Sequence, residues 1–99
     1  MRFLRRDSGS DQSAIEDFWT WWATSRDRIA AAIEDGSVEQ RVTEISDRVH
    51  RVHADLAWEL APGATSKHAL VVTPEGDPVI RPKALTWLAA APPPDETWE

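Results

Sequence analysis

The stretch Ser13-Ala-Ile-Glu-Asp-Phe-Trp-Thr-Trp-Trp22 decides the fold that this sequence predicts. Ser13 and Glu16 have the spacing of a capping box, in which each side chain bonds a free backbone N–H of the first helical turn. Apolar residues then recur at helical spacing, and they are Ile15, Phe18, Trp19, Trp22, Ile29 and Ile33. Such a stripe is typical of a helix that packs one face on a core. Gly36 should end this helix, because glycine adopts the left-handed cap conformation at little cost.

A second helix is expected directly after Gly36. Ser37 and Gln40 have the spacing of another capping box. The apolar positions that follow alternate steps of four and three, and they are Val38, Val42, Ile45, Val49, Val52 and Leu56. Two helices joined by so short a connection fold back on each other, so we expect an antiparallel helical hairpin.

After His53 the apolar period changes from that of a helix to the alternation of strands. Leu56–Ala61 and His68–Thr73 both alternate, and the turn residues between them favour an antiparallel hairpin around residues 62–66. Pro82 suits the first turn of a third helix, where its missing N–H costs nothing. The residues expected to pack that helix down are Ala84, Leu85, Trp87, Leu88 and Ala91. The proline run at 92–94 should stop it, and residues 97–99 resemble the start of a further strand.

The predicted fold class is therefore α+β. An N-terminal antiparallel helical hairpin packs on a small antiparallel β-sheet, and a third helix lies C-terminal to the two strands. Residues 1–12 are expected to form a flexible N-terminal tail, and residues 13–99 a single domain. A two-stranded sheet is marginal by itself. We therefore expect that the helices cover it or, as the favoured alternative, that the native chain continues past Glu99 with a third strand.

Composition argues against several classes of function. The formal net charge of −6 argues against nucleic-acid binding, because proteins that bind nucleic acids use clusters of Lys and Arg. The chain has no cysteine, which excludes disulfides and thiolate chemistry and fits a cytoplasmic location. No apolar stretch approaches the ~20 residues that span a bilayer. The four glycines are isolated from one another, so no phosphate-binding loop is present.

No motif predicts catalysis, a metal or a cofactor. Asp47, His50 and His53 follow one another at spacings of three. Each step of three turns by about 60° around a helix, so Asp47 and His53 should diverge too far for a metal site. His68 alternates with core residues of its strand, where a histidine is more often a packing residue than a base.

The leading functional hypothesis is a non-enzymatic protein-binding or regulatory module with an aromatic-rich surface. Trp21 lies off the apolar stripe and is expected to be exposed beside Phe18. With Trp98, these residues could form an apolar patch for a partner protein or for self-association. The alternative is that a third strand covers the patch.

Two further hypotheses stay open. The first is a small-molecule binder or enzyme with a pocket between the first helix and the sheet, where Arg26, His68 and Trp58 supply polar and stacking groups. Arg26 falls inside the apolar stripe, so it should extend its charge to water or pair with Glu59 or another strand carboxylate. The second is a structural module of a longer protein.

Three short motifs also suggest a family. They are Phe18-Trp-Thr-Trp-Trp22, Asp55-Leu-Ala-Trp-Glu-Leu60, and Ala91-Pro92 followed by Trp98. In these the chain resembles a family of uncharacterised small bacterial proteins with an α+β order of elements. The resemblance covers most of residues 14–99 and departs at the end, where a further strand would be expected. It implies the order of the elements and no known activity.

Overall fold

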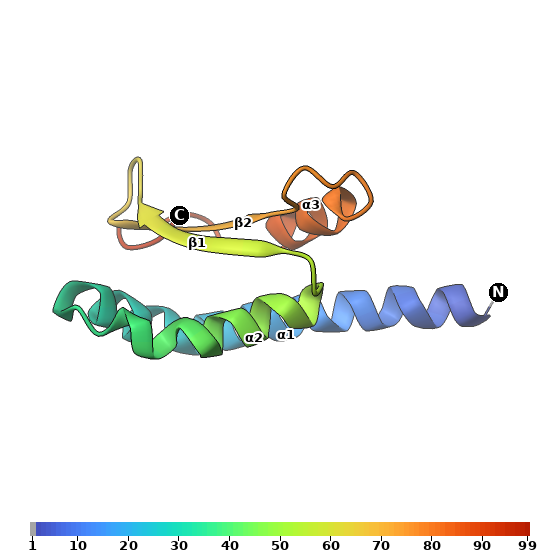
Figure 1. The fold of residues 1–99 in the computed structure, drawn as a ribbon, viewed down its shortest axis with the longest axis horizontal. Coiled ribbons are helices and arrows are strands. Elements are labelled where there is room, and N and C mark those ends of the chain that lie inside the picture. The colour runs from blue at the N-terminus through green and yellow to red at the C-terminus, as the bar shows by residue number, and fades with distance from the viewer. Residues whose placement is uncertain (1) are drawn as a thin grey trace.

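The computed structural model describes the backbone of residues 2–99 and the side chains from Gln12 onward. The elements, in chain order, are α1 (Arg2–Asp35), the short 3-10 helix η1 (Val38–Arg41), α2 (Val42–Val52), β1 (Ala57–Pro62), β2 (His68–Thr73) and α3 (Arg81–Ala89). The α+β class is confirmed, as is the third helix after the strands. The two strands and α3 form one layer, and α1 and α2 form the other (Figure 1).

The first helix begins well before the predicted capping box. α1 starts at Arg2, so Ser13 and Glu16 lie within the helix and the predicted start is wrong. A side chain that can cap a helix does not prevent the helix from extending in the N-terminal direction, and α1 extends past Ser13. The prediction of a flexible tail over residues 1–12 stays a prediction, because Met1 and the side chains of residues 2–11 lie outside the described part of the chain.

The second helix also begins differently from the prediction. Gly36 has the expected positive φ of 82°. The hydroxyl and the amide of Ser37 both donate to the Asp35 carboxylate, which lowers the pKa of that carboxyl. Ser37 therefore makes no side-chain cap, and α2 starts only at Val42, after η1. Val42 is exposed, while the later positions of the seam, Ile45, Val49, Val52 and Leu56, are buried.

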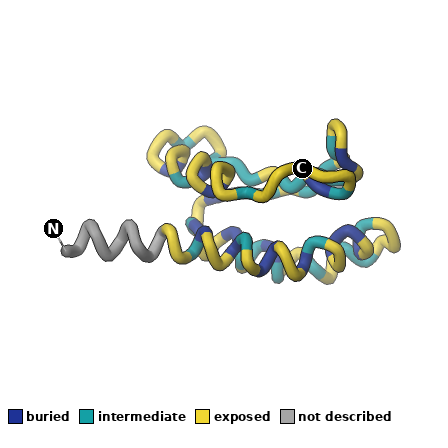
Figure 2. Tube along the Cα trace, turned by 180° about the vertical axis from the view of Figure 1, so that it is seen from behind, coloured by how far each residue is buried: buried dark blue, intermediate teal, exposed yellow. Residues whose placement is uncertain are grey.

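α2 runs beside α1 in the figure, and Glu44 links the two helices (Figure 1). Its carboxylate accepts hydrogen bonds from the Trp21 indole and from the Arg28 guanidinium, each at 2.8 Å. The buried residues of both helices lie mostly along one band, as the dark blue segments show (Figure 2). The helices thus supply most of the large buried side chains of the core.

The predicted strands and their hairpin are confirmed. β1 and β2 pair antiparallel, with Leu60 opposite Leu70 and Trp58 opposite Val72. These four side chains pack against the core formed by the helices. Beyond the hairpin, Trp98 forms a single parallel bridge with His68, so residues 97–99 do begin to pair as a strand on the outer edge of β2.

α3 packs only part of its apolar surface. Pro82 lies in its first turn, as predicted, and Ala84 and Trp87 are buried. Leu85 and Leu88 are each 59% exposed, so the prediction that they pack the helix down is wrong. Ala84 and Trp87 therefore carry the packing of this helix, while Leu85 and Leu88 leave most of their surface in solvent.

An aromatic cluster connects α1 to α3 and to the C-terminus. The Trp19 and Trp87 rings stack with their centroids 4.7 Å apart, and Trp22 meets Trp98 edge to face at 4.8 Å. Trp22 is buried as predicted, while Trp19 is only half-buried. The Trp19 indole donates to the Trp87 carbonyl at 3.0 Å, which satisfies its polar atom at the rim.

Replacing Trp22 with alanine should destabilise the fold strongly. The substitution removes a buried indole and leaves a cavity between α1 and the C-terminal residues, so we expect the free energy of unfolding to fall by about 3–5 kcal/mol. Urea denaturation followed by circular dichroism measures this. Val42→Ala is the control, because that side chain is exposed and should cost less than about 0.5 kcal/mol. Equal effects of the two substitutions would contradict the placement of Trp22 in the core.

Candidate functional site

The predicted aromatic patch is not a surface in this structure. Phe18, Trp21 and Trp98 are only 1%, 8% and 4% exposed, so the prediction that they form an open patch is wrong. The Trp21 indole is held by Glu44, and the Arg48 guanidinium lies 5.7 Å from the centre of its ring. α2 therefore covers the Trp21 ring, which lies off the apolar stripe of α1.

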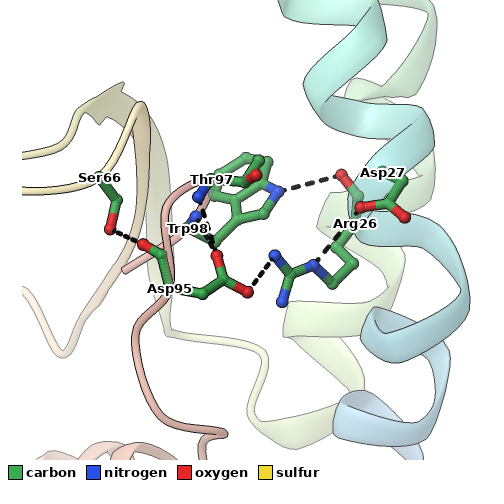
Figure 3. A network of polar contacts seen from close by, with 6 residues as sticks. All are labelled: Arg26, Asp27, Ser66, Asp95, Thr97 and Trp98. Carbon is green, nitrogen blue, oxygen red and sulfur yellow. Dashed lines mark hydrogen bonds and ion pairs between the residues drawn. The ribbon is translucent and has the colours of Figure 1, made fainter.

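Trp98 is buried because the C-terminal segment, residues 92–99, folds back onto α1. Its indole donates to the Arg26 carbonyl at 3.0 Å, and the Arg26 guanidinium pairs with Asp95 at 2.6 Å (Figure 3). Asp27 lies 3.7 Å from the same guanidinium. The ion pair predicted for Arg26 therefore exists, but its partner is Asp95 and not Glu59.

The carboxylates of the C-terminal segment hold backbone amides. Asp95 accepts from the Trp98 and Thr97 amides, each at 2.9 Å, and these bonds together with Arg26 keep its pKa below the ordinary value. The Ser66 hydroxyl donates to the Asp95 carbonyl. Glu99 accepts the Thr65 and Ala64 amides, which lower its pKa in the same way. The segment is thus fixed to α1 through Asp95 and Trp98, and to the β1–β2 turn through Asp95 and Glu99.

A cavity of about 60 Å³ lies where α1, β2, α3 and the C-terminal segment meet. We call it the indole cavity, and it is lined by Trp19, Trp22, Arg26, Leu70, Trp87, Leu88, Ala91, Pro92, Pro93, Trp98 and Glu99. Its position matches the pocket that was predicted between the first helix and the sheet. Of the three residues proposed for that pocket, only Arg26 lines it.

The other two residues lie elsewhere. The Trp58 indole donates to the Ser46 hydroxyl of α2 at 2.9 Å, so Trp58 joins β1 to α2. The His68 ring lies 5.1 Å from the Trp98 ring, and its buried Nε2 has no hydrogen-bond partner among the described residues. Both side chains therefore serve packing between elements, and neither reaches the indole cavity.

A second, open depression lies between β2 and α3. This β2–α3 groove measures about 340 Å³ and is lined by Leu70, Val71, Val72, Pro74, Arg81, Ala84, Leu85, Trp87 and Leu88. It shares Leu70, Trp87 and Leu88 with the indole cavity, so the two are neighbours. Its lining is almost wholly apolar, and Arg81 is its one charged residue.

The predicted absence of a metal site rested on the spacing of the histidines. In the structure, Nε2 of His50 lies 3.1 Å from the Leu56 carbonyl, and Nδ1 of His53 accepts the Asp55 amide. Among the residues described, no three His, Asp or Glu side chains gather as metal ligands would. No helix in the described part of the chain has the length and apolar character needed to cross a membrane.

Comparison with protein-family models, with curated proteins and with solved structures found no match to this chain. The resemblance to a bacterial family therefore stays a prediction.

Sequence reasoning missed the groove because it assigned every apolar residue of the third helix to the core. A signal was present: Ala84, Leu85, Trp87 and Leu88 are spread around more than one face of a nine-residue helix. Such a short helix cannot bury all of its faces against two neighbours.

Asp95→Asn should destabilise the fold at neutral pH and lose its effect in acid. The folded pKa of Asp95 lies below the ordinary 3.8, so the ionised carboxylate stabilises the fold above that pH, and this contribution disappears as the pH falls through the lowered value. Urea denaturation of both proteins from about pH 7 down to about pH 3 should show the difference shrinking in acid.

Asp27→Asn is the matched control, because the Asp27 side chain is 94% exposed and its contact with Arg26 is longer. It should leave stability nearly unchanged across the same range. A difference for Asp95→Asn that is independent of pH would show that the charge of Asp95 does not hold the segment.

Proposed function

We propose that this chain is a non-enzymatic interaction module that binds an apolar segment of a partner protein in the β2–α3 groove. In this proposal, the antiparallel hairpin of α1 and α2 packed on the sheet is the rigid base. The binding surface is the side of the sheet where α3 lies. The aromatic residues act beneath that surface rather than on it.

The distribution of exposed apolar side chains carries the proposal. Among the described residues, the large exposed hydrophobics are Val42, Val71, Val79, Leu85 and Leu88. All but Val42 belong to β2, to α3 or to the loop that joins them. Val71, Leu85 and Leu88 line the β2–α3 groove together. Single exposed apolar residues are ordinary, but a group that lines one groove of a small domain is typical of an interaction surface.

The size of the indole cavity favours a protein partner over a small molecule. Pockets that bind small molecules usually measure about 300–1,000 Å³ and enclose most of the ligand. The indole cavity is far smaller at about 60 Å³. The groove is larger but open, which suits the side chains of a protein segment better than a molecule that must be enclosed.

A charge placed in the groove should abolish partner binding without unfolding the module. Leu88→Asp and Leu85→Asp put a carboxylate at half-exposed positions, so stability should change little, while burial of the charge under a partner is costly. Tagged wild type and variants are used to recover partners from the native cells. At least one protein should be retained by the wild type and reduced about tenfold or more by either variant.

Val42→Asp is the matched control, since Val42 is similarly exposed but lies on α2. It should retain the partner at the wild-type level. If no protein distinguishes the groove variants from the control, the proposal is wrong, and a structural role becomes the better interpretation. Sedimentation of the isolated chain tests self-association: a dimer that Leu88→Asp dissociates would identify the groove as a contact between copies and not with a different protein.

A further inference from the structure

The turn between β1 and β2 holds the Glu99 carboxylate through its backbone. Residues 63–67 form this turn, and the amides of Ala64 and Thr65 both donate to one oxygen of Glu99, the Thr65 amide at 3.1 Å. The pKa of Glu99 is lowered chiefly by the Thr65 amide, and the Ala64 and Ser66 amides and the Thr65 hydroxyl act in the same direction. Three successive amides that converge on one anion form a nest, an arrangement that binds phosphate groups in many proteins.

Gly63 leaves room for the anion in this nest. A Cβ atom at this position would come too close to the Ser66 carbonyl and to the Glu99 carboxylate. Glycine therefore permits the close approach of the anion to the turn. The isolated glycines of the sequence argue against a glycine-rich loop between a strand and a helix, but a nest on a turn between two strands needs only successive amides. The turn thus has the shape and the donors of a site for an anionic oxygen.

The nest lies at the surface of the molecule. Ala64, Thr65 and Glu99 are all exposed, and among the described residues only the Glu99 carboxylate accepts the Ala64 and Thr65 amides. The backbone of Glu99 is bonded separately, to His68 and Leu70 of β2. Rotation of the Glu99 side chain alone would therefore open these donors to a solute.

The charges around the nest allow another anion to replace Glu99. Lys67 ends the turn, and its ammonium group forms no ion pair with the residues that the structure describes. The Lys67 amide donates to the Glu96 carbonyl at 3.0 Å, so Glu96 is a neighbouring acidic residue, while Asp95 is already paired with Arg26. With Glu99 displaced, the charges of Lys67 and Glu96 offset each other, and the amides supply the attraction for the ligand.

Competition with Glu99 selects the class of ligand. A free carboxylate would make the same hydrogen bonds as Glu99 without being tethered beside the turn, so Glu99 is favoured over it at ordinary concentrations. A phosphate group carries about two negative charges and three terminal oxygens, so it can accept from the amides and from the Thr65 hydroxyl at once. A phosphate group therefore binds the nest more strongly than a carboxylate and can displace it.

We propose that the β1–β2 turn is a binding site for a phosphate group, either the free ion or a phosphate monoester, and that the Glu99 carboxylate occupies the site within the chain and competes with the ligand. The site is separate from the β2–α3 groove and does not depend on the function proposed for that groove. Binding of phosphate removes one attachment of the C-terminal segment, while the pair between Arg26 and Asp95 remains.

Titration with inorganic phosphate tests the site. The full chain is titrated at about pH 7, where phosphate carries close to two negative charges, and sodium chloride keeps the ionic strength constant. The NMR signals of the Ala64, Thr65 and Ser66 amides should shift and saturate. In Glu99→Gln, which keeps the size of the side chain and removes its charge, the Kd for phosphate should fall about tenfold or more, because the competing carboxylate is gone.

Glu96→Gln is the matched control. It makes the same change of charge close to the turn, but no hydrogen bond joins the Glu96 side chain to the turn amides. Its effect on the Kd should stay below about threefold, because an exposed charge is screened. Equal effects of the two substitutions would overturn competition by Glu99. No saturable shift of the turn amides in any of the three proteins would overturn the site itself.

Two further probes test the chemistry of the ligand. Acetate should bind Glu99→Gln about tenfold more weakly than phosphate does, and acetate that binds as tightly would overturn the choice of a phosphate group. Free phosphoserine replaces inorganic phosphate in the last titration. Tighter binding of phosphoserine identifies a phosphate monoester as the ligand, and tighter binding of inorganic phosphate identifies the free ion.

Discussion

Contact between the indoles of α1 and those of the last third of the chain is the interaction on which this fold depends. A sheet of two strands cannot form a stable unit unless something packs on it. Trp19 meets Trp87 of α3 and Trp22 meets Trp98 of the C-terminal segment, both at ring-centroid distances below 5 Å. Each indole buries a large apolar area and also offers one N–H, which ties the cluster to the carbonyls of Trp87 and Arg26. The cluster therefore supplies both burial and a defined register between elements that are distant in sequence.

Polar contacts around the C-terminal segment make that register specific. Arg26 lies in the apolar stripe of α1, and its guanidinium pairs with Asp95. The Asp95 carboxylate also accepts hydrogen bonds from the backbone amides of Thr97 and Trp98, and these bonds position the Trp98 indole (Figure 3). An exposed ion pair by itself contributes little to stability. This ion pair belongs to a network of polar contacts that together fix the position of Trp98. The parallel bridge between Trp98 and His68 follows from that position.

Features that depend on local periodicity were predicted correctly from the sequence. Features that depend on contacts between distant segments were not. The two strands, the β-hairpin and the start of α3 near Pro82 all follow from alternation and turn chemistry within about ten residues. The exposure of Trp21 was predicted wrongly because Glu44 and Arg48 of α2, which hold its ring, are not neighbours in sequence. Asp95 could not be identified as the partner of Arg26 for the same reason. The two capping boxes are local signals, but each was overridden: one by continuation of α1, the other by the Asp35 carboxylate that takes the Ser37 hydroxyl.

The exposed leucines of α3 border the β2–α3 groove, whose other wall is formed by residues of β2. The face of the sheet turned away from the helices carries Ala57, Glu59 and Ala61 on β1, and these are small or charged residues suited to water. On β2 the same face carries Val71, which lies opposite Glu59 and is 38% exposed. Val71 also lines the β2–α3 groove beside Leu85 and Leu88, so the large exposed side chains of β2 and α3 meet there. An open groove lined by such apolar side chains is the kind of surface on which the proposed partner segment would pack.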